Sequence, residues 1–138
     1  CEKWTESVYD YILCAEVTTP MRSRGVLQQI LDLLITSGAD ACFDVSPVWC
    51  PAEYLMTVDD ASIASFLVTP EKKILRQTCR AAWRIAGTGY AFTRQAIEME
   101  NYMLGKVAVL KRDRGPPISI DTMDDYLALK YQFETPEM

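Results

Sequence analysis

The 138-residue sequence has no histidine, and that absence excludes several kinds of chemistry. A Ser-His-Asp triad uses an imidazole as its general base, and most zinc sites include a histidine ligand. A catalytic cysteine would also lack its usual base. Any reaction at this chain must therefore rest on carboxylates, hydroxyls, Arg or Lys side chains and a hard metal ion.

Metal-binding or redox spacing is also missing among the five cysteines, none of which forms a C-x-x-C pair. Cys14, Cys42 and Cys79 have apolar neighbours along the sequence. An odd count without ligand spacing indicates reduced core thiols, so we expect a cytoplasmic protein.

Long apolar runs and long basic runs are absent too. The longest apolar stretches are a few residues, against the ~20 that cross a bilayer, so we expect no membrane segment. The net charge is -5, without a Lys or Arg run to follow a phosphate backbone, which argues against nucleic acid as a partner. No secretory signal opens the chain, and its start at Cys1 instead of Met indicates a trimmed chain or a fragment.

The composition is that of one globular domain over residues 1–138, with 49% hydrophobic and 24% charged residues. A short apolar run at 11–15 predicts a buried strand. Apolar residues then recur at helical spacing from an N-cap at Ser23 to a stop at Gly38. A second apolar run at 41–45 follows at once. Strand, helix and strand in this order predict a βαβ unit with a parallel sheet.

The rest of the chain continues this mixed pattern. It predicts a hairpin of 54–58 and 63–68, strands at 90–92 and 107–110, a helix at 93–100, extended backbone at 118–121, and a last helix with a capping box at Thr122 and Asp125. We therefore expect an α/β three-layer sandwich with a mainly parallel central sheet and a small additional β element.

The loop at 16–22 has the best position for a site, because ligands of open α/β sheets bind beyond the carboxyl ends of parallel strands. Glu16, Arg22 and the hydroxyls of Thr18 and Thr19 could bind a polar ligand there. The alternative is that the two threonines only satisfy a turn.

A second place is the acidic segment that begins at Ser119. Alternation puts Ser119 and Asp121 on the same side of a strand end, where a carboxylate could hold Mg²⁺. Asp124 and Asp125 have another explanation, since acids in the first turn of a helix favour its dipole.

A third place is the Gly-Thr-Gly sequence at 87–89. It is not the dinucleotide-binding fingerprint, because Phe92 stands where the third glycine is needed. The glycines indicate a close backbone approach or a turn.

Together these places resemble the sugar-activating cytidylyltransferases, the family of CMP-N-acylneuraminate and CMP-Kdo synthetases. The family's Gln-Pro-Thr-Ser-Pro-Leu-Arg is similar to Glu-Val-Thr-Thr-Pro-Met-Arg at 16–22, which a helix and an S-G-A-D turn follow. Its Arg-Gln pair corresponds to residues 76–77, and its Asn-Gly-Ala-Ile-Tyr strand to 86–90. Its Ile-Asp-Ile-Asp-Thr corresponds to 118–122, so the resemblance extends from about residue 9 to 133.

The resemblance implies that the anomeric hydroxyl of an acidic sugar attacks the α-phosphate of CTP, which releases pyrophosphate with Mg²⁺ assistance. It makes Asp121 the metal ligand on which catalysis depends, with Ser119 at the second metal position. The substrate-binding residues that it implies are Glu16, Thr18, Thr19, Arg22, Arg76, Gln77 and Tyr90.

The chain departs from the family's pattern in several places. The Gly-rich, basic loop that cradles the triphosphate has no counterpart, and Ser119 replaces the first metal-binding Asp. Glu16 replaces a neutral Gln and would repel a sugar carboxylate unless Arg76 or protonation compensates. We therefore expect the chain alone to be inactive. The alternative function is that of a non-catalytic, diverged or truncated domain that binds a ligand or dimerises, and the reading frame upstream of Cys1 would separate the two.

Relatives in that family dimerise through a stretch corresponding to 98–110, so the resemblance also implies a homodimer. Met99, Tyr102, Met103 and Leu104 crowd apolar side chains into this short segment, as interface centres do. The alternative is that they pack inward under the sheet.

Overall fold

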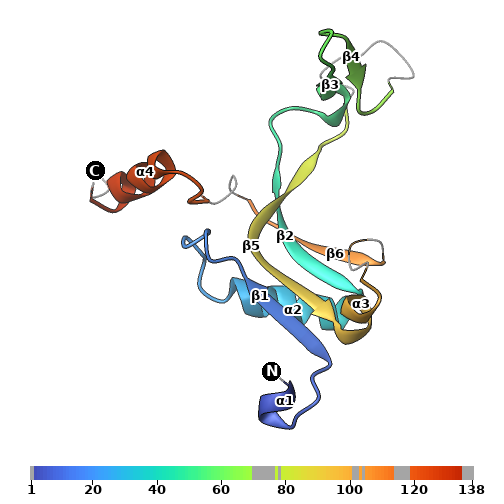
Figure 1. The fold of residues 1–138 in the computed structure, drawn as a ribbon, viewed down its shortest axis with the longest axis vertical. Helices are drawn as coiled ribbons and strands as arrows, with labels where there is room; N and C mark the ends of the chain where they lie inside the picture. Colours follow the sequence, from blue (N-terminus) through green and yellow to red (C-terminus); the bar gives the residue numbers. More distant parts are fainter. Residues whose placement is uncertain are drawn as a thin grey trace.

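The computed structural model describes residues 2–69, 77, 79–100, 103, 105–113 and 119–134. Its elements, in chain order, are α1 (Glu2–Thr5), β1 (Tyr11–Ala15), α2 (Val26–Ser37), β2 (Ala41–Pro47), a 3-10 turn (Ala52–Tyr54), β3 (Met56–Val58), β4 (Ala64–Phe66), β5 (Trp83–Thr93), α3 (Arg94–Glu98), β6 (Val107–Lys111) and α4 (Met123–Glu134) (Figure 1). No helix in these ranges is long and apolar enough to cross a membrane.

The main sheet has the strand order β1-β5-β2-β6. β5 runs antiparallel to both β1 and β2, whereas β2 and β6 are parallel. β1 and β2 therefore point the same way, as the βαβ pattern predicts, but β5 lies between them. The α/β class is confirmed, and the sheet is mixed where the sequence predicts a mainly parallel one.

The length of β5 is the reason for this difference. Sequence patterning predicts only 90–92 as a strand, whereas β5 extends over Trp83–Thr93 and includes the Gly-Thr-Gly segment. Two glycines interrupt the apolar alternation on which the prediction depends. Within this segment Gly89 pairs with Ala15 of β1, while the register with β2 shifts between the pairs at Tyr90 and Ile85, as in a β-bulge.

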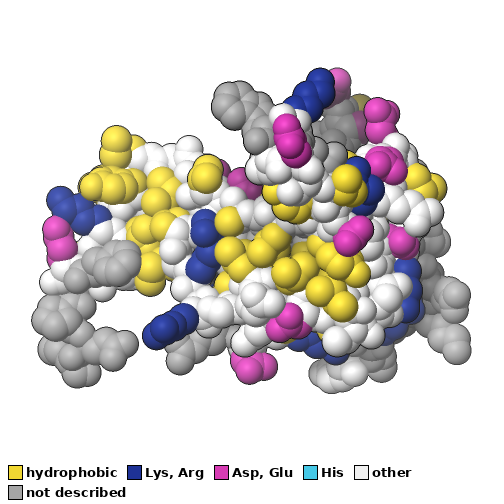
Figure 2. Space-filling model, turned by 90° about the horizontal axis from the view of Figure 1, so that it is seen from below, with side chains coloured by type: hydrophobic (Ala, Val, Ile, Leu, Met, Phe, Trp, Pro, Cys, Tyr) yellow, Lys and Arg dark blue, Asp and Glu magenta, His cyan; other side chains and the backbone are white. Residues whose placement is uncertain are grey.

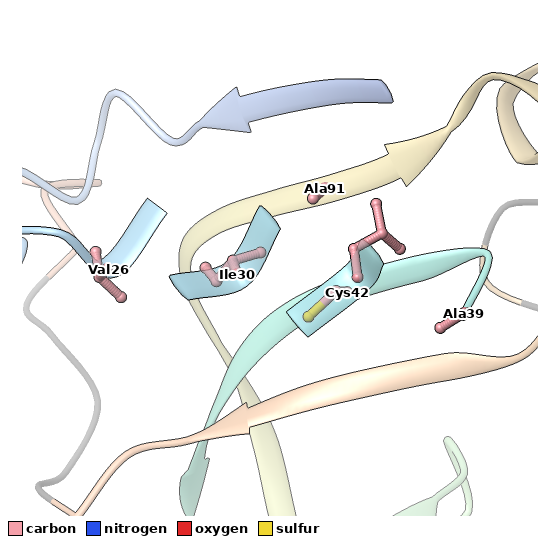
Figure 3. Packing of buried hydrophobic residues seen from close by; sticks show 6 residues of the cluster. Val26, Ile30, Ala39, Cys42 and Ala91 are labelled. Atoms are coloured by element: carbon pink, nitrogen blue, oxygen red, sulfur yellow. The ribbon is translucent and has the colours of Figure 1, made fainter. Parts of the chain in front are cut away.

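Helix α2 packs against all four strands and forms the core with one face of the sheet. Its Ile30 and Leu34 are fully buried and lie against Cys42 of β2 and Ala91 of β5 (Figure 3). Gly38 ends the helix in the left-handed conformation (φ 58°), as predicted. The predicted N-cap is wrong by two positions: Gly25 occupies it with φ 82°, and no side chain caps the helix start.

The opposite face of the sheet carries aromatic side chains. The rings of Tyr90 and Phe92 stack with centroids 6.3 Å apart, and the ring of Phe43 lies 6.0 Å from that of Tyr90. Among the described helices, α2 alone contacts all four strands, and it does so from the other side. The third layer of the predicted sandwich is therefore not found in the described part of the chain.

The predicted hairpin is confirmed as the separate two-stranded sheet of β3 and β4. Asp59 shapes its turn, because its Oδ1 accepts hydrogen bonds from the backbone N–H groups of Ala61 and Ile63. The hairpin lies away from the main sheet, beyond the carboxyl end of β2 and the amino end of β5 (Figure 1).

A buried ionic network joins three strands. The carboxylate of Asp44, fully buried in β2, accepts a bond from the backbone N–H of Thr88 in β5 at 3.0 Å and one from Nη1 of Arg112 at 2.9 Å. The same Nη1 donates to Oγ1 of Thr88 at 2.7 Å. Arg112 directly follows β6, so the network fixes β2, β5 and the end of β6 relative to one another.

We predict that Asp44→Ala lowers the free energy of unfolding by about 3–5 kcal/mol, because it leaves the Arg112 guanidinium without its buried counterion. Urea unfolding followed by circular dichroism measures this. The control is Asp32→Ala on α2, which removes an exposed carboxylate bonded only to Gln28 among the described side chains and should change stability by less than about 0.5 kcal/mol. An unchanged urea midpoint for Asp44→Ala would contradict the structural role of the network.

Candidate functional site

The loop after β1 folds back onto β5. The backbone N–H of Glu16 donates to the carbonyl of Thr88 at 3.4 Å, which continues the β1–β5 pairing by one step. Thr19 is buried, and the guanidinium of Arg22 donates to the backbone carbonyl of Glu16. These bonds fix the loop and leave the Glu16 side chain at the strand end.

A pocket of about 380 Å³ opens beside this strand end. Its lining residues are Glu16, Tyr90, Phe92, Ile97 and Met103. Tyr90 and Phe92 lie two positions apart on β5, so both side chains point to the same face, opposite the α2 core. Ile97 of α3 and Met103 complete the lining. The sequence-based prediction that Glu16 and Tyr90 share a pocket therefore agrees with the geometry.

The two glycines of the Gly-Thr-Gly segment have different surroundings. Gly87 has φ 74°, and a Cβ atom there would lie 3.9 Å from the Tyr90 hydroxyl and 4.0 Å from Oγ1 of Thr19, which is ordinary van der Waals contact. Gly89 makes the close backbone approach that the sequence suggests, because a Cβ atom there would collide with Cδ2 of Leu27 and lie 3.1 Å from the carbonyl oxygen of Cys14.

The electrostatics of the pocket are negative. Burial raises the pKa of Tyr90 above its ordinary value, and the charges of Glu16 and then Asp44 raise it further. Asp44 is neutralised by Arg112, whereas no described side chain donates a hydrogen bond to or forms an ion pair with the carboxylate of Glu16. Glu16 is therefore the charged group that a ligand in this pocket would meet.

The acidic segment also reaches this end of the sheet. The backbone N–H of Ile120 donates to the carbonyl of Thr18 at 2.8 Å, and Oγ of Ser119 donates to Oγ1 of Thr18 at 3.2 Å. Two of the three places singled out from the sequence are thus in contact. The predicted strand end is wrong, however, because residues 119–121 are not part of any strand.

The described residues do not complete a metal site. Asp121 is exposed, and its backbone N–H donates to Oδ2 of Asp125 at 3.2 Å. That same oxygen accepts from the backbone and hydroxyl of Thr122 at the start of α4, and these bonds lower the pKa of Asp125. Asp125 therefore caps the helix, as the capping box predicts. Across the described ranges, no three or more Cys, Asp or Glu side chains gather in a way that could hold an ion.

Six of the other predicted site residues are not among those that line the pocket: Thr18, Thr19, Arg22, Gln77, Ser119 and Asp121. Gln77 is exposed, and Arg76 lies outside the described residues. Conversely, Phe92, Ile97 and Met103 line the pocket without having been assigned to a ligand site. The two-residue spacing of Tyr90 and Phe92 is a signal for the first of them, while Ile97 and Met103 come from elements whose placement depends on tertiary contacts.

Comparison with protein-family models finds no match to this chain, and comparison with curated proteins finds none either. The site must therefore be interpreted from its own geometry, which is a half-buried carboxylate and a phenol hydroxyl in an otherwise aromatic and aliphatic pocket.

We predict that Glu16→Gln lowers the pKa of Tyr90, because it removes a negative charge that disfavours the phenolate. An alkaline titration of the tyrosine ring carbons by NMR, with Tyr90→Phe to assign the signal, measures this. The part of the free energy of unfolding that depends on the neutral Tyr90 phenol is fully present below the ordinary tyrosine pKa. It is lost as the pH rises through the raised pKa of the folded state. Glu98→Gln, on α3 but not in the pocket lining, is the control and should leave the Tyr90 titration in place. A Tyr90 pKa that stays the same in Glu16→Gln would show that the charge of Glu16 does not act on the Tyr90 phenol.

Proposed function

We propose that this chain is a cytidylyltransferase-like domain that binds the acidic sugar and does not transfer CMP on its own. The observation that supports it best is the meeting of three distant segments at the end of β1. Residues 16–19, 87–90 and 119–120, each of which resembles a motif of the family, are joined there by hydrogen bonds or close approach. Convergence of this kind is what a shared substrate site requires.

In this proposal the sugar occupies the pocket of Glu16 and Tyr90, with the hydroxyls of Thr18 and Thr19 at the nucleotide side. Arg22 holds the loop through its bond to the Glu16 carbonyl, and Arg76 and Gln77 remain assigned to substrate by resemblance alone. Mg²⁺, where present, would neutralise phosphate charge next to Asp121 and Ser119. Asp121 offers one carboxylate beside Ser119, and Mg²⁺ sites use one or two carboxylates together with substrate phosphates.

The exposed edge of β1 supports a fold that is completed by further structure. All five residues of β1 are exposed, including Tyr11, Ile12 and Leu13, although their sequence is that of a strand buried on both faces. The proposed complete fold is the three-layer, mainly parallel sandwich that the resemblance implies, with additional strands beside β1.

The alternative remains a non-catalytic domain that binds a ligand or dimerises. It is favoured by the bonds of two residues near the expected metal position. Asp125 uses its carboxylate to cap α4, and Ser119 uses its hydroxyl in a bond to Thr18. Pyrophosphate release and sugar binding can be measured on the same preparation. Sugar binding without pyrophosphate release supports the proposed sugar-binding domain, whereas pyrophosphate release would indicate an active enzyme.

We predict that the purified 138-residue chain releases no pyrophosphate from CTP and N-acetylneuraminate or Kdo with Mg²⁺, because its sequence has no counterpart of the Gly-rich, basic loop whose backbone N–H groups cradle the triphosphate in the family it resembles. The same chain should bind the sugar acids, and chemical shifts of residues 16–19 and Tyr90 would report the binding. Tyr90→Ala should abolish those shifts. Pyrophosphate release would contradict the prediction that the chain alone is inactive. The absence of any sugar binding would contradict the proposed function.

We also predict a homodimer through residues 98–110. Met99 and Met103 are 68% and 44% exposed, so neither is packed fully inward, and exposed methionines of this kind are enriched at interface centres. Tyr102 and Leu104 lie outside the described residues. Sedimentation should show a dimer at micromolar concentration and a monomer for the double variant Met99→Glu, Met103→Glu. Met123→Glu, also at an exposed methionine, should leave the dimer intact, and a monomeric parent chain would contradict this interface.

A further inference from the structure

The pocket beside β1 has an unusual combination of groups for a site that receives an anion. Of the five lining residues in the described part of the chain, Glu16 is the only one that carries a charge, and that charge is negative. The other four offer aromatic and aliphatic surface: Tyr90, Phe92, Ile97 and Met103. A carboxylate that enters the pocket would therefore meet repulsion and no lining cation.

Two described arginines near the pocket, Arg22 and Arg112, bind groups other than the Glu16 carboxylate. Arg112 is held by Asp44 and Thr88, and Arg22 donates to the backbone carbonyl of Glu16 and not to its carboxylate. The negative charge of Glu16 also acts on the Tyr90 phenol, which places the two groups within electrostatic range of each other. A half-buried carboxylate in apolar surroundings is stabilised when a ligand provides the counterion.

The rest of the lining suits a cation as well. The faces of tyrosine and phenylalanine rings attract an ammonium group within about 6 Å, and the effect grows when the group is desolvated. The Tyr90 and Phe92 rings are stacked, with 5° between their planes, and both belong to the lining of the pocket. The Met103 thioether adds a soft, adaptable contact on the far side.

We propose that this pocket selects a sugar bearing a protonated amino group, with the ammonium paired to Glu16 against the Tyr90 and Phe92 rings. The inference rests on the proposed function in so far as the ligand is a sugar acid; the acid group then lies outside the pocket, toward Thr18 and Ser119. An N-acetylated amine carries no charge and forms no ion pair with Glu16.

The test compares two sugar acids that differ only at the amine: the methyl glycoside of neuraminic acid and that of N-acetylneuraminic acid. Their binding to the full chain is followed at pH 6.5, where a free amine is protonated, by the ¹³C-methyl signal of Met103, assigned with Met103→Leu. We expect the free amine to bind about tenfold or more tightly, as a charge-assisted bond allows. Glu16→Gln should abolish this preference, whereas Glu98→Gln should retain it.

A second pair, glucosamine and N-acetylglucosamine, lacks the carboxylate and separates the two proposals. Equal affinity for the free and acetylated acids would overturn the selection of an amine and leave sugar-acid binding intact. Binding of glucosamine that depends on Glu16, without binding of either acid, would support the cationic pocket and overturn the proposed function. No binding by any of the four compounds would overturn both, provided that circular dichroism shows the chain folded.

Discussion

Strand β5 is the constraint on which the rest of the structure depends. It pairs with β1 on one side and β2 on the other, so it is the element that joins the two strands of the βαβ unit into one sheet. Its side chains also separate two environments. Ala91 lies in the α2 core, while Tyr90 and Phe92 form the wall of the pocket on the opposite face. A shift of β5 by one residue would exchange these roles and remove both the core contact and the pocket.

Two carboxylates near β5 show how differently the same group can be used. Asp44 is fully buried and has two donors, the Thr88 backbone and the Arg112 guanidinium. Its charge is matched inside the protein, so it acts as a structural link between strands. Glu16 has the opposite situation, since the described part of the chain gives its carboxylate no donor while its backbone is well bonded. A fixed backbone with a free charged side chain is the arrangement expected of a binding residue.

The sequence predicts well those features whose signals are local. The strand at 11–15, the helix end at Gly38 and the cap by Asp125 each depend on a few adjacent residues, and all three are found. The predicted burial of that strand is wrong in the described structure, where all five of its residues are exposed. The start of α2 was misplaced because the chain enters the helix through a left-handed Gly25, which serves without a capping side chain. Strand order is non-local, and nothing in residues 83–93 alone says that they insert between β1 and β2. For the same reason Glu16 and Tyr90 could be brought together by motif resemblance, whereas Ile97 and Met103 could not.

The contact between Thr18 and the segment at 119–120 decides what the site can do. It holds the acidic segment against the loop by two hydrogen bonds, one from the backbone and one between side-chain hydroxyls. Ser119 uses its hydroxyl in this contact and Asp125 uses its carboxylate at α4. The other two acids of the segment are Asp121 and Asp124, and Asp121 is the one that lies outside the helix. A single exposed carboxylate holds a divalent ion weakly unless phosphates complete the coordination. Metal binding at this end of the sheet would then depend on a nucleotide already being present, whereas the pocket of Glu16 and Tyr90 needs no metal to bind its ligand. Under the proposed function, the described residues would therefore recognise the ligand, while the nucleotide would supply most of the ligands of a metal ion.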